Sequence, residues 1–138
     1  MKSATFFLFL AVLAHASVQG QALTVVVKGI KNDKGNVAAA LYRSPDEFMK
    51  KTWQSRSADS SSGELKFIFE TVPAGNYAIS VMHDENKNGK VDTNMMGIPK
   101  EGFGFSNDAM GAFGPPEFDK AKFVIPDTQQ VIITLKYY

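Results

Sequence analysis

Short apolar segments with the spacing of β-strands recur along this chain, separated by turn residues. Leu23, Val25 and Val27 take every second position of one segment, and Phe67 and Phe69 do so in another. Such alternation places apolar side chains on one face of a strand. Six strands are predicted, at residues 22–30, 36–43, 64–70, 75–84, 121–125 and 130–138. Because no long helical period lies between them, we predict an all-β fold, a single antiparallel β-sandwich.

The inward faces of these strands define the expected core. It consists of Val25, Val27, Leu41, Phe67, Phe69, Tyr77, Ile79, Val81, Ile133 and Leu135. One short crossover helix is predicted at residues 45–53, because Ser44 suits an N-cap and a proline follows it at the first helical position. Phe48 and Trp53 would fasten this helix to the sandwich. Residues 54–64 are small and polar, so we expect an exposed loop there.

The first 20 residues have the order of features of a secretory signal peptide. Lys2 is followed by an apolar run from Phe6 to Ala14 and then by small residues that suit a signal peptidase. The apolar run is too short to span a membrane. We therefore predict a signal peptide at 1–20 and one domain at 21–138. The mature protein would be periplasmic or extracellular, without a membrane span.

Charge and cysteine content narrow the classes of function. Removal of Lys2 with the signal peptide leaves 14 basic and 14 acidic side chains. A nucleic-acid-binding protein needs a concentrated basic face, so this balance argues against one. The chain has no cysteine. The domain must therefore be held by its core, without disulfides.

A long segment, residues 85–120, lacks the period of a strand or a helix. It is rich in Gly, Asn, Pro and Phe. Loops of this length in compact domains are usually functional or disordered, and its apolar content argues against disorder. We predict an ordered lid over one end of the sandwich. Met95 and Met96 are expected to fill gaps beneath it, and the Phe-rich part, 102–118, is expected to be docked.

The lid begins with "HDENKNGKVDTN", which resembles a calcium-binding loop. Calcium takes six to eight oxygen ligands, often from alternate loop positions, with a glycine at the bend. The candidate ligands, in order of loop position, are Asp84, Asn86, Asn88, the Lys90 carbonyl and Asp92. The position of the usual bidentate glutamate is Met95, so any site should be weak. Three further oxygens from the lid are candidates to complete it: Asn94, Glu101 and Asp108.

A hairpin turn is the alternative interpretation of this loop. Asn88-Gly89 is a strong type I′ turn signal, and Asn and Asp are common turn residues. A turn accounts for these two residues but not for the ligand-like spacing of Asp84, Asn86 and Asp92. The sequence favours calcium and leaves the turn open.

Two longer motifs carry a family resemblance. "HDENKNGKVDTNMMGIPKEGFGFSNDA" and "FGPPEFDKAKF" resemble a family of exported bacterial proteins catalogued only as a domain of unknown function. The resemblance covers essentially the whole mature chain. More weakly, "FETVPAGNYAISV" is similar to transthyretin-like and carboxypeptidase regulatory-like sandwiches. The resemblance implies a secreted sandwich, Ig-like or transthyretin-like, without an established activity.

We interpret the protein as a non-catalytic binding or accessory module. Phe103, Phe105 and Phe113 are candidates for an aromatic platform that binds a sugar or peptide, or else they seal the end of the core. The partner would be a small molecule, a glycan or another protein.

His83 supports rival interpretations. It would form a hydrolase site with Ser106, or a copper carrier with methionines such as Met82 or Met95. No nucleophile motif surrounds Ser106. Adjacent strand residues point to opposite faces, so Met82 and His83 cannot easily share one ion. We therefore expect His83 to anchor the lid by hydrogen bonds.

Overall fold

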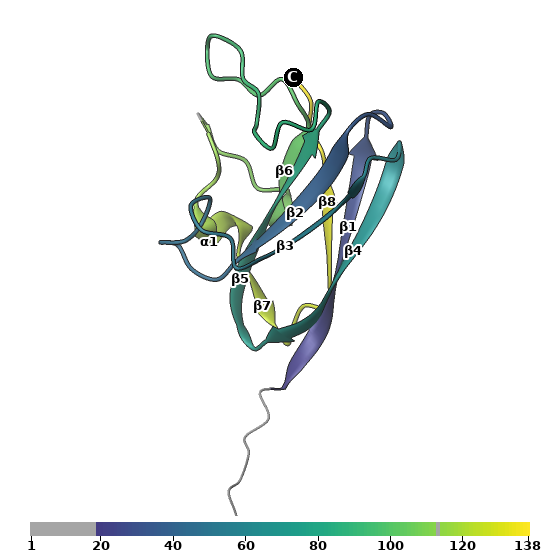
Figure 1. The fold of residues 1–138 in the computed structure, drawn as a ribbon. Coiled ribbons are helices and arrows are strands. Elements are labelled where there is room, and N and C mark those ends of the chain that lie inside the picture. The colour runs from purple at the N-terminus through teal and green to yellow at the C-terminus, as the bar shows by residue number, and fades with distance from the viewer. Residues whose placement is uncertain (1–18, 113) are drawn as a thin grey trace, which may run out of the picture.

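Two β-sheets pack face to face in the computed structural model, which describes residues 19–112 and 114–138 (Figure 1). The strands are β1 (Gly20–Ile30), β2 (Asn36–Tyr42), β3 (Gln54–Asp59), β4 (Gly63–Pro73), β5 (Gly75–Asp84), β6 (Phe103–Phe105), β7 (Phe123–Ile125) and β8 (Gln130–Thr134). One sheet has the order β4-β1-β8. The other has the order β3-β2-β5-β6, and β7 pairs with the start of β5. The predicted all-β sandwich is confirmed.

The strand pairing differs from the prediction at one place. Every other paired strand is antiparallel, but β1 and β8 run parallel, with Val25 beside Val131 and Val27 beside Ile133. Parallel neighbours need a long crossover, and here nearly the whole chain lies between the two strands.

The predicted signal peptide lies outside the described residues except for its last two. In the described part of the chain, no helix is long and apolar enough to cross a membrane.

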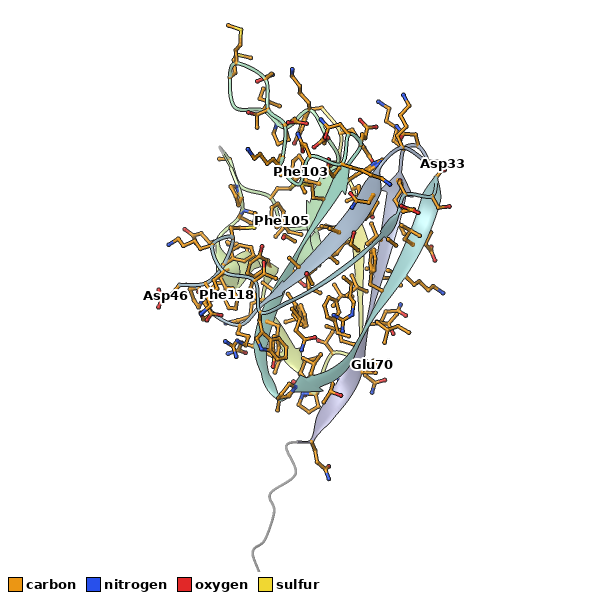
Figure 2. All side chains as sticks on the ribbon, viewed as in Figure 1. Asp33, Asp46, Glu70, Phe103, Phe105 and Phe118 are labelled. Carbon is orange, nitrogen blue, oxygen red and sulfur yellow. The ribbon has the colours of Figure 1, made fainter. Side chains whose placement is uncertain are left out.

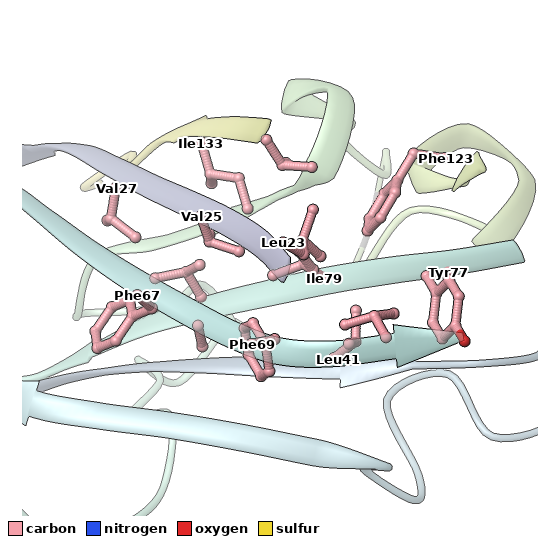
Figure 3. Packing of buried hydrophobic residues seen from close by; sticks show 14 of the residues in the cluster. Leu23, Val25, Val27, Leu41, Phe67, Phe69, Tyr77, Ile79, Phe123 and Ile133 are labelled. Atoms are coloured by element: carbon pink, nitrogen blue, oxygen red, sulfur yellow. The ribbon is translucent and has the colours of Figure 1, made fainter. Parts of the chain in front are cut away.

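The core lies between the two sheets, as expected. All ten predicted core residues are buried, and Figure 3 shows most of them converging from the two sheets. Leu23, Val25 and Val27 of β1 face Leu41 and Ile79 of the opposite sheet (Figure 3). Burying each aliphatic side chain stabilises the fold by about 1.5–3 kcal/mol.

The predicted crossover helix at 45–53 does not form. Ser44 does act as a cap, since its Oγ accepts the Glu47 N–H at 3.3 Å and its carbonyl accepts the Phe48 N–H at 3.0 Å. The chain then leaves the helical region at Met49, which has φ +60°. The segment is therefore a pair of turns. Phe48 is buried and Trp53 packs against the core, so both fasten the crossover as predicted.

The loop expected at 54–64 is wrong, because residues 54–59 form the edge strand β3. Five of its six side chains are polar and every second one is exposed, so the apolar pattern did not reveal it. Its backbone pairs with β2 along six residues. Arg56 then reaches across to β4, where its Nε donates to the Ile68 carbonyl at 3.3 Å. Polar, charged residues of this kind are common on edge strands.

The lid, residues 85–120, contains more regular structure than predicted. It includes β6, the 3-10 turn η1 (Ser106–Asp108) and most of the helix α1 (Phe118–Ala121). Phe105 and Phe118 pack with Tyr42 and Phe48 in a second apolar cluster outside the main core. Figure 2 shows Phe103, Phe105 and Phe118 along one side of the molecule. The docking predicted for 102–118 is therefore confirmed for these residues, and Phe113 lies outside the described residues.

The first part of the lid projects beyond the ends of the sheets, beside the C-terminus (Figure 1). Met95 and Met96, expected beneath it, are instead 105% and 80% exposed. The cause is a tight turn in which Asn94 Oδ1 accepts the N–H groups of Met96 and Ile98, at 2.9 and 3.0 Å. This turn directs both methionines into solvent.

Candidate functional site

The polar loop, residues 84–92, begins with Asp84 at the end of β5. This carboxylate is buried, and its two oxygens accept different backbone N–H groups of the loop. Oδ1 accepts the Asn88 N–H at 3.1 Å, and Oδ2 accepts the Gly89 N–H at 2.7 Å. Asp84 therefore ties the bend of the loop to the sheet.

Asp92 is the second centre of the loop. The Asn86 amide donates to its Oδ2 at 2.7 Å, and the Asn88 amide donates to Oδ1 and Oδ2 at 2.8 and 3.0 Å. The bonds from Asn88 and then Asn86 lower the pKa of the Asp92 carboxyl, because they stabilise its charged form. Lys90 enters the network through its N–H, which donates to Asn88 Oδ1 at 2.9 Å.

The predicted ligand residues are thus brought into one loop, but they bond to one another. The amide Nδ2 groups of Asn86 and Asn88 face Asp92, while their Oδ1 atoms accept backbone N–H groups. Within residues 19–112 and 114–138, no three His, Cys, Asp or Glu side chains are arranged to hold a metal ion. Calcium at this loop remains a prediction.

Glu101 closes the loop from the far side of the lid. This carboxylate is only 4% exposed. Its Oε1 accepts the Glu85 N–H at 3.2 Å and its Oε2 accepts the Asp92 N–H at 3.4 Å. Burial raises the pKa of Glu101, and the negative charges of Asp92 and Asp84 raise it further. The three carboxylates therefore act on one another across the loop.

The other two residues considered as completing ligands lie elsewhere. Asn94 caps the exposed turn at the tip of the lid. Asp108 accepts the Thr134 N–H at 3.0 Å and so joins η1 to β8. Of the three candidates, only Glu101 bonds to the polar loop.

His83 is fully buried on the inner face of β5. Its Nε2 lies 2.7 Å from the Lys34 carbonyl, and its Nδ1 lies 2.7 Å from the Tyr137 hydroxyl. Nε2 therefore carries a proton and donates it to the carbonyl, and Nδ1 shares a hydrogen bond with the tyrosine hydroxyl. Its backbone N–H donates to the Gly102 carbonyl in the lid at 2.8 Å. The direct bond to the lid is made by the backbone, and the ring bonds to other segments.

The His83 pairings required by the rival functions are not formed. Ser106 is fully buried, where its Oγ accepts the Ile79 N–H at 2.9 Å and donates to the Ala121 carbonyl at 2.5 Å. Both ring nitrogens of His83 have other partners, so no His83–Ser106 pair exists. Met82 lies on the outer face of β5, away from the imidazole.

A pocket of about 570 Å³ that was not predicted from the sequence lies on the outer face of the larger sheet. We call it the lid pocket. Its floor follows the strand register, with two rows of side chains that cross β2, β5 and β6. The rows are Ala38, Met82 and Phe103, then Ala40, Ser80 and Phe105. The alanines and the serine leave the space, and the larger residues bound it.

The lid and the crossover form the walls of the lid pocket. Gly89 and Val91, which belong to the polar loop, line one side, and Met49 of the crossover lines another. A second hollow of about 480 Å³ adjoins it and shares Phe103. Phe103 is half-buried and Phe105 is buried, so the two line the pocket and do not form an exposed platform.

One feature of the sequence could have revealed this pocket. "NVAAALY" has Ala38 and Ala40 at the outward positions of β2, where a solvated strand usually carries larger polar residues. Small outward residues beside an apolar lid indicate covered space on that face.

These observations define an all-β sandwich with a lid that carries a polar loop and covers an apolar pocket. A family model described as an uncharacterized protein conserved in bacteria (DUF2141) matches residues 25–133. The chain belongs to this family, which confirms the membership expected from its motifs. No curated protein and no solved structure matches the chain.

Proposed function

We propose that this protein is an exported, non-catalytic binding module in which a calcium ion fixes the lid beside the lid pocket. The observation that carries the proposal is the position of Glu101. One buried carboxylate accepts N–H groups from both ends of the polar loop, and it shares that loop with Asp84 and Asp92. A divalent cation would relieve the mutual repulsion of the three carboxylates.

The donor set suits calcium better than a transition metal. It offers carboxylate and amide oxygens, whereas copper and zinc sites usually include imidazole or thiolate. Calcium would replace the amide N–H groups as the partner of Asp92, and the amides of Asn86 and Asn88 would then turn their oxygens toward the ion. This rearrangement reduces the net binding energy. We therefore expect a weak site, with a Kd of about 0.1–1 mM.

Calcium would influence binding because the polar loop is also a wall of the lid pocket. Gly89 donates its N–H to Asp84, and the same glycine lines the pocket beside Val91. Fixing the loop therefore fixes one wall of the pocket. Export is supported by the N-terminal segment, whose composition is that of a signal peptide.

Thermal unfolding with and without calcium tests this proposal. A ligand that binds only the folded state stabilises it by RT ln(1 + [L]/Kd), about 1.4 kcal/mol at ten times the Kd. The melting temperature should rise by a few degrees in about 10 mM calcium and by less in magnesium. Replacing Asp84 and Asp92 together by Asn should remove the shift.

A matched control removes two negative charges far from the loop. Asp46 and Glu70 are exposed and lie away from the polar loop, Asp46 near Phe118 and Glu70 at the other end of the sheets (Figure 2). The variant Asp46→Asn with Glu70→Gln should keep the calcium shift. Identical melting curves of the unmutated protein in calcium and in chelator would contradict the proposal and leave the loop as a turn.

A further inference from the structure

We infer that the lid pocket binds an uncharged, mainly apolar small molecule. This inference rests on the proposed binding module and names its ligand class. The pocket volume of about 570 Å³ falls within the range of small-molecule sites, about 300–1,000 Å³. It is bounded on one side by the sheet and on the others by the lid and the crossover.

The charge of the ligand follows from the lining. In this chain 21% of the residues are charged. None of the described residues that line the lid pocket is charged. A charged ligand group would lose its hydration there without an ionic partner, which is costly. The pocket therefore selects against anions and cations.

The floor offers a limited number of polar contacts. The hydroxyls of Tyr42 and Ser80 lie 3.3 Å apart, and both residues line the pocket. They can bond to one hydroxyl, carbonyl or amine of a ligand in addition to each other. The ligand is thus an apolar molecule with at most a few uncharged polar groups.

Methionines make the walls adaptable. Met49 and Met82 line the lid pocket, and Met96 and Met110 line the adjoining hollow. Methionine side chains are flexible and polarizable, and they are common on surfaces that accept ligands of different shapes. A ligand longer than the lid pocket can extend past Phe103 into the second hollow.

Two fluorescent probes that differ by one charge test this inference. N-phenylnaphthylamine is uncharged, and anilinonaphthalenesulfonate is the same ring system with a sulfonate. We expect the folded protein to bind the uncharged probe with a Kd of about 1–100 µM and the sulfonate at least about tenfold more weakly. Equal or tighter binding of the sulfonate, or no binding of the uncharged probe, would overturn the inference.

Two pairs of variants locate the binding site. Ala38→Phe fills the floor, and Thr24→Phe adds the same side chain to the outer face of the other sheet. Met49→Asp places a charge in the wall, and Ile68→Asp places one on the exposed face of β4. Asp tolerates the positive φ of residue 49 better than Met does, so this variant should fold.

Ala38→Phe and Met49→Asp should weaken binding of the uncharged probe by about tenfold or more, and their controls should weaken it by less than about twofold. If both members of a pair bind the uncharged probe equally well, the probe is not in the lid pocket.

Melting curves of the unmutated protein in calcium separate the two proposals. A calcium shift without probe binding leaves the calcium-fixed lid and removes the ligand class. Probe binding without a calcium shift leaves the ligand class and removes the calcium-fixed lid.

Discussion

Replacing Ser106 by Ala should destabilise the domain strongly, because this hydroxyl fills a gap in the backbone pairing of β5. β7 pairs with residues 75–77 of that strand and β6 with residues 80–82. Between them, the N–H of Ile79 is left to the Ser106 Oγ, which also donates to Ala121 in α1. Alanine at this position would leave a buried donor and a buried carbonyl without partners.

The expected loss follows from these two bonds. An unsatisfied buried donor costs about 1–3 kcal/mol, and losing the second bond adds about 0.5–1.5 kcal/mol. The sum, about 1.5–4.5 kcal/mol, corresponds to a fall in melting temperature on the order of 10 °C for a domain of this size.

Urea unfolding, followed by the fluorescence of Trp53, measures the free energy of unfolding directly. The slope with urea should be unchanged, since the folded and unfolded surfaces stay the same. Ser55→Ala, at an exposed position of β3, is the control and should change stability by less than about 0.5 kcal/mol. A loss of less than about 0.5 kcal/mol in Ser106→Ala would refute the reasoning.

Three further results are expected. Because the pKa of Glu101 is raised, its contribution to stability without calcium is present at low pH and is lost as pH rises above the ordinary 4.5. The free energy of unfolding of the unmutated protein should therefore fall, relative to that of Glu101→Gln, as pH rises above 4.5. A free-energy difference between the two proteins that does not change with pH would contradict this. Gly35→Ala should cost more stability than Gly63→Ala in thermal unfolding, because both glycines have positive φ but only a Cβ at residue 35 would collide with the Asp84 carbonyl. Equal losses would show that this close approach is unimportant. Calcium and the uncharged probe should strengthen each other's binding by the same factor in paired titrations, since coupling between two sites is reciprocal; a factor of one would show that the loop and the pocket are independent.

The core was predictable because burial on one face imposes a period of two on the sequence. Val25, Val27 and Ile79 obey that period and are fully buried. The edge strand β3 was not predictable in this way, because Ala58 is its only apolar residue and its order comes from backbone pairing with β2. The parallel pairing of β1 with β8 is a matter of topology that local patterns do not record.

Local signals at the crossover were correct but insufficient for a helix. Ser44 caps the first turn as its residue type indicates. A helix of about nine residues is marginal without tertiary support. Here Phe48 is buried in the second apolar cluster, and the chain turns away at Met49. Packing of one aromatic residue thus outweighed the propensity of the segment.

The site was only partly predictable from the sequence. The spacing of Asp84, Asn86, Asn88 and Asp92 indicated that they share a loop, and the structure places them in one hydrogen-bonded network. The sequence did not single out Glu101 among the three residues considered as completing ligands, because that choice depends on how the lid returns to the loop. The lid pocket depends on the register of three strands, which no local motif specifies.

Equilibrium dialysis with labelled calcium tests the central claim most directly, because it counts ions without relying on stability. The unmutated protein should bind one calcium ion per chain with half-saturation at about 0.1–1 mM. The double variant of Asp84 and Asp92 to Asn should bind none, while the control variant of Asp46 and Glu70 should bind normally. Absence of bound calcium at about 5 mM, well above the expected Kd, or equal binding by the double variant, would contradict a calcium-fixed lid.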